Sequence, residues 1–201
     1  MPPAPHFEYQ EIRGAGIEPH VDELGRLRIA VFREFPYLYD GDLDYERDYL
    51  QVYLRSPRSL VVLLRADGRT VGATTCLPMV DEGPEFQEPF RQADMDVNSV
   101  FYLGESVVLP EFRGHGAGRE FMKRRESHAQ ELGGFRFTTF CAVDRPADHP
   151  ARPADYRPLD QFWTRMGYSR RPDLTCQFPW KEIGEDKETP KQLTFWLKKW
   201  T

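Results

Sequence analysis

The order of helical and strand-like segments along the chain predicts an α+β (α/β layered) domain with a mixed central sheet flanked by helices. Two observations carry this prediction. The dipeptide Asp67-Gly68 lies between two apolar segments, which is typical of a tight hairpin. Further on, the apolar segment Val100–Leu109 leads into a glycine-rich loop and then into an amphipathic helix. Because no linker or repeat divides the 201 residues, we expect one domain over 1–201.

Periodicity and turn residues assign the elements of the N-terminal half. Apolar residues recur at helical spacing before Pro36, which ends the first helix. Residues 81–96 are acidic and contain Pro84 and Pro89, so we expect a loop there with one helical turn. The elements expected in this half are a strand over 6–13, helices over 17–35 and 43–54, and hairpin strands over 60–64 and 71–75.

The C-terminal half is expected to alternate strands and helices. Its long helix has an apolar stripe on which Arg125 is the only polar residue, and it stops at Gly133-Gly134. Residues 144–158 contain four prolines, which exclude a helix or a central strand. The elements expected in this half are strands over 100–109, 135–143, 168–179 and 193–200, and helices over 116–132 and 159–166.

Composition restricts the class of partner and the compartment. The net charge of -5 does not favour a nucleic-acid partner, and no apolar segment approaches the roughly 20 residues of a membrane helix. The N-terminus, Met1–Pro5, lacks the pattern of a signal peptide. The 3 cysteines are far apart and the 5 histidines lack metal-ligand spacing, so we expect no disulfide and no metal. We place the protein in the cytoplasm.

The segment Arg113-Gly114-His115-Gly116-Ala117-Gly118-Arg119 carries the clearest functional signal. It lies between a strand and a helix, and a helix start exposes unpaired backbone N–H groups with partial positive charge. Its three glycines remove the side chains that would hold a ligand away from these groups. The arrangement predicts a pyrophosphate site, with Arg119 adding a cation in the first helical turn.

Three types of phosphate-binding loop compete for this segment. A Walker A loop requires Lys and then Ser or Thr after its last glycine, whereas Gly118 is followed by Arg119-Glu120. A dinucleotide fingerprint has the spacing GxGxxG and an acidic residue about 20 positions later, whereas the spacing here is GxGxG. The first two types therefore fit poorly.

The third type fits: Val107–Gly118 resembles the acetyl-CoA signature of the GNAT superfamily of N-acetyltransferases. That signature is an apolar strand, often followed by Pro and an acidic residue, and then Arg-x-x-Gly-x-Gly. Downstream, Phe162-Trp163-Thr164-Arg165-Met166-Gly167-Tyr168 is similar to a later element of the same superfamily. The resemblance covers residues 6–180. It implies a mostly antiparallel sheet and transfer of an acetyl group from acetyl-CoA to a primary amine by direct attack.

The resemblance also implies which residues contact the cofactor. The loop Arg113–Arg119 would bind the pyrophosphate, with His115 contributing only its backbone N–H. Val107 and Val108 would contact the thioester and pantetheine through backbone groups. Asp144 falls near a position that often touches the cofactor in relatives.

The reaction needs a base, because an alkyl amine with a pKa of about 10.4 is protonated at neutral pH. Glu105 is our candidate. Without a bulge it shares a strand face with Leu103 and Val107, and a carboxylate among apolar neighbours is a stronger base. The usual acid of the superfamily, a tyrosine, is replaced here by Trp163, so we consider Tyr168 as a catalytic residue in its place.

Two segments are expected to form the acceptor site. Tyr37, Tyr39 and Asp40 lie between the first two helices, where aromatic and acidic side chains suit a small cationic amine. Asp148 and His149 lie in the proline-rich insertion, which is placed to wall or cover the site.

Several alternatives remain open at this level. Three functions are open for the chain: an N-acetyltransferase, a catalytically silent acyl-CoA-binding module and a nicotinamide-dependent oxidoreductase. Trp163 is the feature that favours the silent module. The acceptor is a small cationic amine, a protein lysine or a protein N-terminus. The apolar segment Leu193–Leu197 forms an internal strand or the interface of a homodimer.

Overall fold

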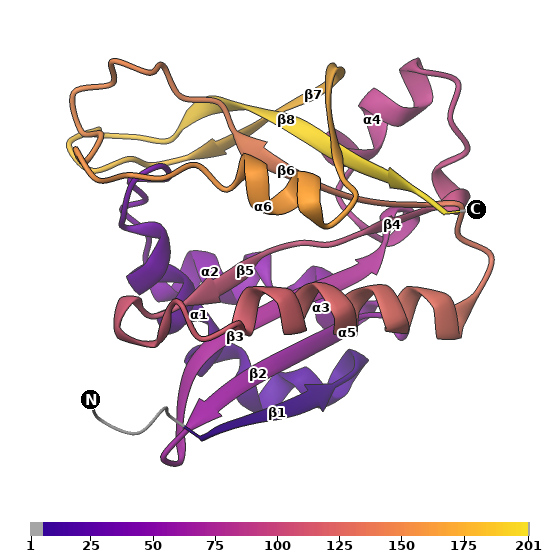
Figure 1. Ribbon diagram of the computed structural model, residues 1–201, viewed down its shortest axis with the longest axis horizontal. Coiled ribbons are helices and arrows are strands. Elements are labelled where there is room, and N and C mark those ends of the chain that lie inside the picture. Colours follow the sequence, from indigo (N-terminus) through magenta and orange to yellow (C-terminus); the bar gives the residue numbers. More distant parts are fainter. Residues whose placement is uncertain (1–5, 201) are drawn as a thin grey trace.

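A mixed sheet of eight strands forms the centre of the molecule (Figure 1). The computed structural model describes residues 6–200. The strands are β1 (Phe7–Ile12), β2 (Leu60–Ala66), β3 (Arg69–Pro78), β4 (Val100–Tyr102), β5 (Ser106–Val108), β6 (Phe137–Val143), β7 (Ser169–Trp180) and β8 (Thr189–Lys199). Their order is β1-β2-β3-β4-β6-β8-β7, and β5 pairs with β3. Among the described strands β4 and β6 are parallel and the other neighbours antiparallel, which confirms the predicted α+β fold.

Helices cover both faces of the sheet, and each face has its own hydrophobic core. The helices are α1 (Val21–Phe32), α2 (Leu43–Tyr49), α3 (Gln51–Arg55), α4 (Pro84–Gln92), α5 (Ala117–Leu132) and α6 (Asp160–Arg165), with 3-10 helices η1 (Gly14–His20), η2 (Met79–Asp81), η3 (Val97–Ser99) and η4 (Pro110–Phe112). Leu24 of α1, Tyr53 of α3 and Phe90 of α4 belong to one core. Phe121 of α5 and Trp163 of α6 belong to the other, so the sheet separates α1 to α4 from α5 and α6.

The sheet divides into two arms beyond Leu103. The pairing of β4 with β6 ends at a hydrogen bond of 2.7 Å from Leu103 N to Thr139 O. Beyond it β5 pairs with β3, and β6 pairs with β8 (Figure 1). The prediction of one strand over 100–109 is wrong, because the chain bends at Gly104 to make room for Tyr53. A Cβ on Gly104 would lie 2.2 Å from the Tyr53 hydroxyl oxygen.

A nine-residue helix, α4, replaces the loop that we expected over 81–96. Pro84 lies in its first turn, where the missing N–H removes no helical hydrogen bond. Phe86 and Phe90 lie one turn apart, are buried, and pack against aromatic side chains of β7 and β8. The prediction was wrong because burial of these two rings outweighs the unfavourable Pro89 in the helix.

Two segments that we predicted as single helices are each divided. The segment over 17–35 contains the end of η1 and then α1, which stops at Phe32 before the cis peptide Phe35–Pro36. The segment over 43–54 breaks at Leu50 into α2 and α3. The helical character of both segments is confirmed, but their lengths were overestimated.

The hairpin and the C-terminal strands follow the prediction. Asp67 and Gly68 have positive φ values of 50° and 75°, as a tight turn between β2 and β3 requires. The segment Leu193–Leu197 lies in β8, which pairs with β6 on one side and β7 on the other. It is therefore an internal strand and offers no free edge to a second copy of the chain.

The described helices include none that is both long and apolar enough to cross a membrane. Within residues 6–200, no group of three or more His, Cys, Asp or Glu side chains is arranged to hold a metal ion. Residues Met1–Pro5, on which we based the absence of a signal peptide, lie outside the described residues, as does Thr201.

Glu82, which links η2 to α4, is a buried carboxyl group. Its Oε1 accepts a hydrogen bond from Gly83 N at 3.2 Å, and its Oε2 has no partner within the described part of the chain. Burial raises the pKa of Glu82 from 4.5 to about 7. The folded protein therefore binds this proton more tightly than the unfolded chain does. The free energy of unfolding contains this contribution in full below pH 4.5 and loses it as the pH rises through about 7.

We predict that the substitution Glu82→Gln removes this pH dependence. At about pH 8 the variant should be more stable than the wild type by roughly 3 kcal/mol, since one pKa unit corresponds to about 1.36 kcal/mol. At about pH 4 the two proteins should be equally stable, because Glu82 is then protonated in both states. Urea unfolding at both pH values measures the difference, with the exposed Glu88→Gln as the control. An equal effect at both pH values would contradict the titration of Glu82.

Candidate active site

A large cavity opens where the two arms of the sheet separate. Its volume is about 1350 Å³. One wall consists of residues from 104–108, and the opposite wall of residues 140–144. The start of α5 lines one end, and the segment after α1 lines the other. Pockets that bind drug-sized ligands measure about 300–1,000 Å³, so this cavity has room for an extended ligand together with a second molecule.

The glycine-rich loop forms one end of the cavity. Gly114 and Gly116 have φ values of 83° and 87°, and nothing lies within 4 Å of the places where their Cβ atoms would be. Gly116 is the N-cap of the 16-residue helix α5, and no side chain caps this helix. The first backbone N–H groups of α5 are therefore free beside Ala117 and Gly118, which line the cavity. This geometry suits a phosphate or pyrophosphate group.

The cationic side chains of the loop either pair with other protein groups or lie outside the cavity wall. Arg113 donates from Nε to Val108 O at 2.9 Å and pairs with Glu34 at 2.8 Å. These contacts hold the loop against β5 and the segment after α1. His115 and Arg119 are exposed and lie outside the cavity wall. At this end of the cavity the groups best placed to contact an anion are therefore backbone N–H groups rather than these side chains.

The free edge of β5 presents backbone groups to the cavity. Leu109 N donates to Val71 O at 2.9 Å, which makes these two residues a hydrogen-bonded pair. Because such pairs alternate along an antiparallel ladder, Val107 also bonds to β3, and the N–H groups of Ser106 and Val108 point away from it. Ser106 and Val108 line the cavity, whereas Val107 is fully buried in the core. The geometry keeps Val108 as an expected backbone contact and puts Ser106 in the place of Val107.

Glu105 lies at the apex of the cavity, where the arms part, and is paired with the buried Arg28. Arg28 Nη1 is 2.7 Å from Glu105 Oε1, and Arg28 Nε is 2.5 Å from Glu46 Oε2. The hydroxyl oxygens of Tyr49 and Tyr53 lie 3.5 and 3.4 Å from Glu105 Oε2. Two carboxylates thus share one guanidinium, and the cluster carries an excess of negative charge.

The prediction that Glu105 lies among apolar neighbours is wrong. Leu103 faces the α5 side of the sheet and Val107 the α1 side, because the bend at 103–105 interrupts the alternation of side chains. Sequence reasoning also missed Arg28. The available signal was a charged residue four positions after Leu24, on the apolar face of the first helix.

Aromatic side chains form the wall at the α1 end of the cavity. Tyr37 and Tyr39 line it, and burial raises the pKa of both hydroxyl groups. Asp40, which we expected beside them, lies outside the wall and pairs with Arg33 at 3.0 Å and Lys181 at 3.1 Å. The other aromatic residues that line this part include Phe32, Phe35, Tyr45, Tyr49, Phe86, Tyr102, Phe178 and Trp180.

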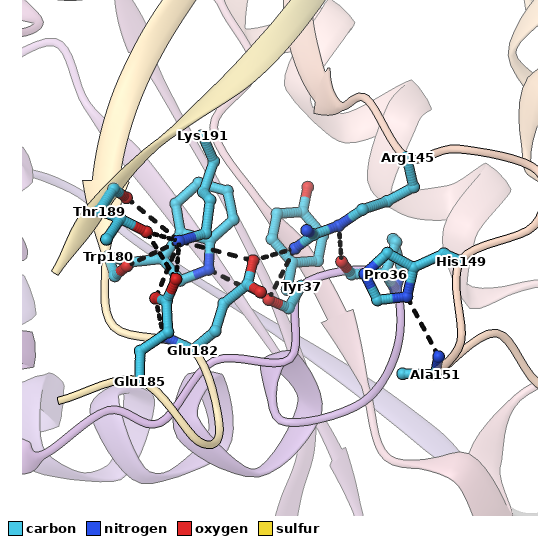
Figure 2. Close-up of polar contacts among 10 residues, drawn as sticks. All are labelled: Pro36, Tyr37, Arg145, His149, Ala151, Trp180, Glu182, Glu185, Thr189 and Lys191. Atoms are coloured by element: carbon cyan, nitrogen blue, oxygen red, sulfur yellow. Dashed lines mark hydrogen bonds and ion pairs between the residues drawn. The ribbon is translucent and has the colours of Figure 1, made fainter. Parts of the chain in front are cut away.

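A polar network centred on Arg145 holds this wall in place (Figure 2). Arg145 Nε donates to Pro36 O at 2.7 Å, and its Nη2 donates to Tyr37 O at 3.2 Å and pairs with Glu182. Trp180 Nε1 also donates to Tyr37 O, at 3.0 Å. Arg145 thereby joins three segments that are far apart in the sequence: the loop after α1, the start of the insertion and the turn between β7 and β8. No sequence pattern pointed to this arginine.

The insertion over 144–158 walls the cavity, but through other residues than we expected. Asp144 lines the cavity, and its carboxylate accepts a hydrogen bond of 2.7 Å from Arg170. Asp148 is exposed, and the ring of His149 packs against an aromatic ring of the loop after α1, so neither side chain lines the cavity. The residues of the insertion that do so, besides Asp144, are Arg145, Ala151, Arg152, Pro153, Asp155, Tyr156, Arg157 and Pro158.

Tyr168 belongs to the core and not to the cavity wall. Its hydroxyl is bonded to Thr138 at 2.9 Å and to Glu126 at 2.8 Å. Burial raises the pKa of Tyr168 well above its ordinary value, which opposes the release of a proton. Trp163 does line the cavity, where it packs against Phe140 with 5.0 Å between ring centroids. We therefore do not retain Tyr168 as a catalytic acid.

Residues 26–168 match the sequence profile of the acetyltransferase (GNAT) family. The chain belongs to this family. Its activity is therefore that of an acetyltransferase that uses acetyl-CoA. None of the curated proteins is significantly similar to this GNAT protein in sequence.

Solved structures share the GNAT fold over almost the whole chain. A candidate acetyltransferase from Acinetobacter baylyi has a TM-score of 0.63 at 12% identity, over 100% of this chain and 95% of that one. Ribosomal-protein-alanine N-acetyltransferase from Brucella melitensis has a TM-score of 0.60 at 15% identity, over 96% and 99%. A candidate acetyltransferase from Salmonella typhimurium, solved with acetyl-CoA, has a TM-score of 0.56 at 11% identity, over 96% and 93%. At such identities the likeness concerns the fold alone.

The cavity of this GNAT protein fits acetyl-CoA on two observations. The uncapped start of α5 offers its N–H groups to a pyrophosphate. From there the cavity runs along the free edge of β5 to Glu105. This part of the cavity would hold the extended pantetheine arm. When bound, acetyl-CoA supplies an acetyl group activated as a thioester.

We predict that Gly116→Val weakens the binding of acetyl-CoA by at least about tenfold, because a side chain would cover the N–H groups of α5. Gly68→Val is the matched control, since Gly68 also has a positive φ and open space around its Cβ position but lies in the hairpin turn. Both variants should lose comparable stability, and isothermal titration should show weaker binding in Gly116→Val alone. Unchanged affinity in Gly116→Val would contradict the placement of the pyrophosphate.

Proposed function

We propose that this acetyltransferase transfers the acetyl group to a primary amine by direct attack, and that the acceptor is a small cationic amine. The observation that carries the proposal is the position of the Arg28–Glu46–Glu105 cluster at the apex of the cavity. It puts a carboxylate and an excess of negative charge at the point where the free edge of β5 begins. An aromatic wall leads to this point from the α1 end.

Glu105 is the proposed base. Freeing an alkyl amine of its proton at neutral pH costs roughly 4–5 kcal/mol, since its pKa is about 10.4. Of the two carboxylates paired with Arg28, Glu105 lines the cavity and Glu46 does not. Arg28 and the hydroxyls of Tyr49 and Tyr53 hold the Glu105 carboxylate in one orientation. The amine nitrogen gives its proton to this carboxylate, directly or through water, and then attacks the acetyl carbon.

The aromatic wall favours a cationic acceptor. Tyr37 and Tyr39 line the cavity, and cations bind to the faces of such rings inside proteins. Arg28 already uses this kind of contact, with its Cζ 4.1 Å from the centroid of the Tyr49 ring. Because Arg145 fixes the backbone of Tyr37, the wall is rigid and selects the acceptor by shape as well as by charge.

Backbone groups of β5 are the proposed donors to the carbonyl oxygen of the acetyl group. The N–H groups of Ser106 and Val108 point toward the cavity and away from β3. Negative charge develops on the carbonyl oxygen during attack, and fixed N–H donors stabilise it without rearrangement.

We predict that Glu105→Gln lowers kcat by about 10²–10⁴-fold and abolishes the acidic limb of the pH–rate profile, as loss of a general base does. Glu46→Gln is the matched control, because it removes the same charge from the same arginine outside the cavity wall. Its kcat should fall far less. If both variants lose the same activity, the cluster acts only through its charge and Glu105 is not the base.

The acceptor class is tested by following free CoA with a panel of amines. We expect turnover with small diamines or other cationic primary amines, and little with neutral amines of the same size or with peptide N-termini. Tight binding of acetyl-CoA without turnover on any member would instead identify a silent acyl-CoA-binding module. Turnover confined to lysine peptides or peptide N-termini would move the acceptor to proteins.

A further inference from the structure

Arg125 of α5 is a buried cation that has no carboxylate partner within the described residues. Its relative exposure is 3%, and it lines the cavity. One hydrogen bond from its guanidinium goes to a protein atom, a contact of 2.9 Å from Nη2 to the sulfur of Met122. Its Nε is buried without any partner. A guanidinium has five N–H donors, and a thioether is a weak acceptor, so most of its hydrogen-bonding capacity is unused.

The other deeply placed arginines of the cavity are different in this respect. Arg28 has two carboxylates, and Arg145 has Glu182 and two backbone carbonyls. Arg170 has Asp144. These arginines are held by protein groups and have structural partners. Arg125 faces the same cavity without one.

Burial of the unpaired Arg125 guanidinium is unfavourable for folding, so a functional requirement is the better explanation for its presence. An unpaired charge in a protein interior loses its hydration without gaining an ion pair. Burial accordingly lowers the pKa of the Arg125 guanidinium. The same position on the apolar stripe of α5 would accept methionine or leucine at no such cost. The cation is therefore best explained by a negative charge that appears in the cavity only during function.

The location of Arg125 identifies this charge. Glu105 lies on the α1 side of the sheet, from which the acceptor reaches the apex. The pyrophosphate site lies at the start of α5, on the opposite side. Because the pantetheine arm joins the pyrophosphate to the thioester, acetyl-CoA would reach the apex from the α5 side, and its sulfur would lie on that side of the reacting carbon. Arg125 and Trp163 both line the cavity, and Trp163 has no acidic proton to give to a leaving thiolate.

We propose that Arg125 is a catalytic residue that stabilises the thiolate of the leaving CoA, in place of a tyrosine acid. The proposal rests on the proposed acetylation of an amine. In this step the amine nitrogen forms a bond to the acetyl carbon, and the C–S bond breaks with its electron pair left on sulfur. The ammonium proton has by then passed through Glu105 to solvent. The second proton on nitrogen passes to Glu105 as the C–S bond breaks, and the Arg125 guanidinium pairs with the thiolate. The thiolate needs no proton within the cavity and is released as such or protonated by solvent.

The test measures the ionisation of the CoA thiol in the complex of the enzyme with CoA, in which no acetyl transfer takes place. The ultraviolet absorbance of the thiolate is followed against pH, with the complex of desulfo-CoA as the reference. This reference cancels the titration of protein groups, among them Cys76, Tyr53, Glu105 and Tyr168, whose charges act on Arg125. We expect the pKa of the bound thiol to lie at least about one pH unit below the value near 8.5 that is usual for a thiol.

Three variants separate a catalytic role from a structural one. Arg125→Met should return the pKa of the bound thiol to the value in solution, lower kcat by at least about tenfold and change the KM for acetyl-CoA little. Its Tm should equal or exceed that of the wild type, since an unpaired buried charge is removed. Arg125→Lys should keep part of the lowered thiol pKa. Arg124→Met is the control on the same helix, because Arg124 pairs with Glu11 and Glu120 outside the cavity.

Two results would overturn the proposal. One is a bound thiol in the wild type that ionises at the same pH as free CoA. The other is a thiol pKa that is the same in Arg125→Met as in the wild type. If Arg125→Met does not fold, the wild-type and Arg125→Lys measurements still decide the question. Because these titrations need no acceptor, a failure to find amine turnover leaves the outcome readable.

Discussion

The absence of hydrogen bonding between β5 and β6 is the constraint on which the rest of this molecule depends. Up to Leu103 the sheet is continuous, and beyond it two backbone edges lie next to each other without pairing. Unpaired backbone groups inside a protein are costly unless water or a ligand satisfies them. The edge of β5 that faces the cavity therefore leaves the N–H groups of Ser106 and Val108 without a strand partner. Gly104 makes this possible, because it lets Tyr53 approach so closely that the strand turns away from β6.

The two sides of this opening are electrostatically different. On the α1 side, Arg28 is fully compensated by Glu46 and Glu105, and the surplus charge is negative. On the α5 side, the guanidinium of Arg125 and the positive end of the helix are both uncompensated. This polarity matches the proposed reaction, in which a proton leaves on the α1 side and negative charge leaves on the α5 side. No ion pair joins the two sets of charges among the described residues, although the charge of Glu105 still acts on the Arg125 guanidinium at longer range.

The sequence was informative where local chemistry decides structure, and less so where distant packing decides it. The hairpin at Asp67-Gly68, the strand before the loop and the helix after it followed from turn residues and periodicity. The bend at Gly104 and the helix α4 did not, because the Tyr53 hydroxyl and the partners of Phe86 and Phe90 come from segments far away in the chain. The glycine loop and Glu105 could be proposed as site residues from the sequence, because the pattern that marks them is local. The roles of Arg28 and Arg145 depend on partners that are distant in the sequence, so no local pattern predicted them.

Recognition of the cofactor through main-chain groups has a consequence for how this protein has diverged. The free N–H groups of α5 and β5 are present whatever side chains surround them, provided that the glycines and the fold remain. The side chains around these groups can therefore vary without removing the donors. Solved structures at 11–15% identity keep the same fold over almost the entire chain. Under the proposed function, constraint on the sequence should fall chiefly on the side chains near the acceptor and the departing sulfur.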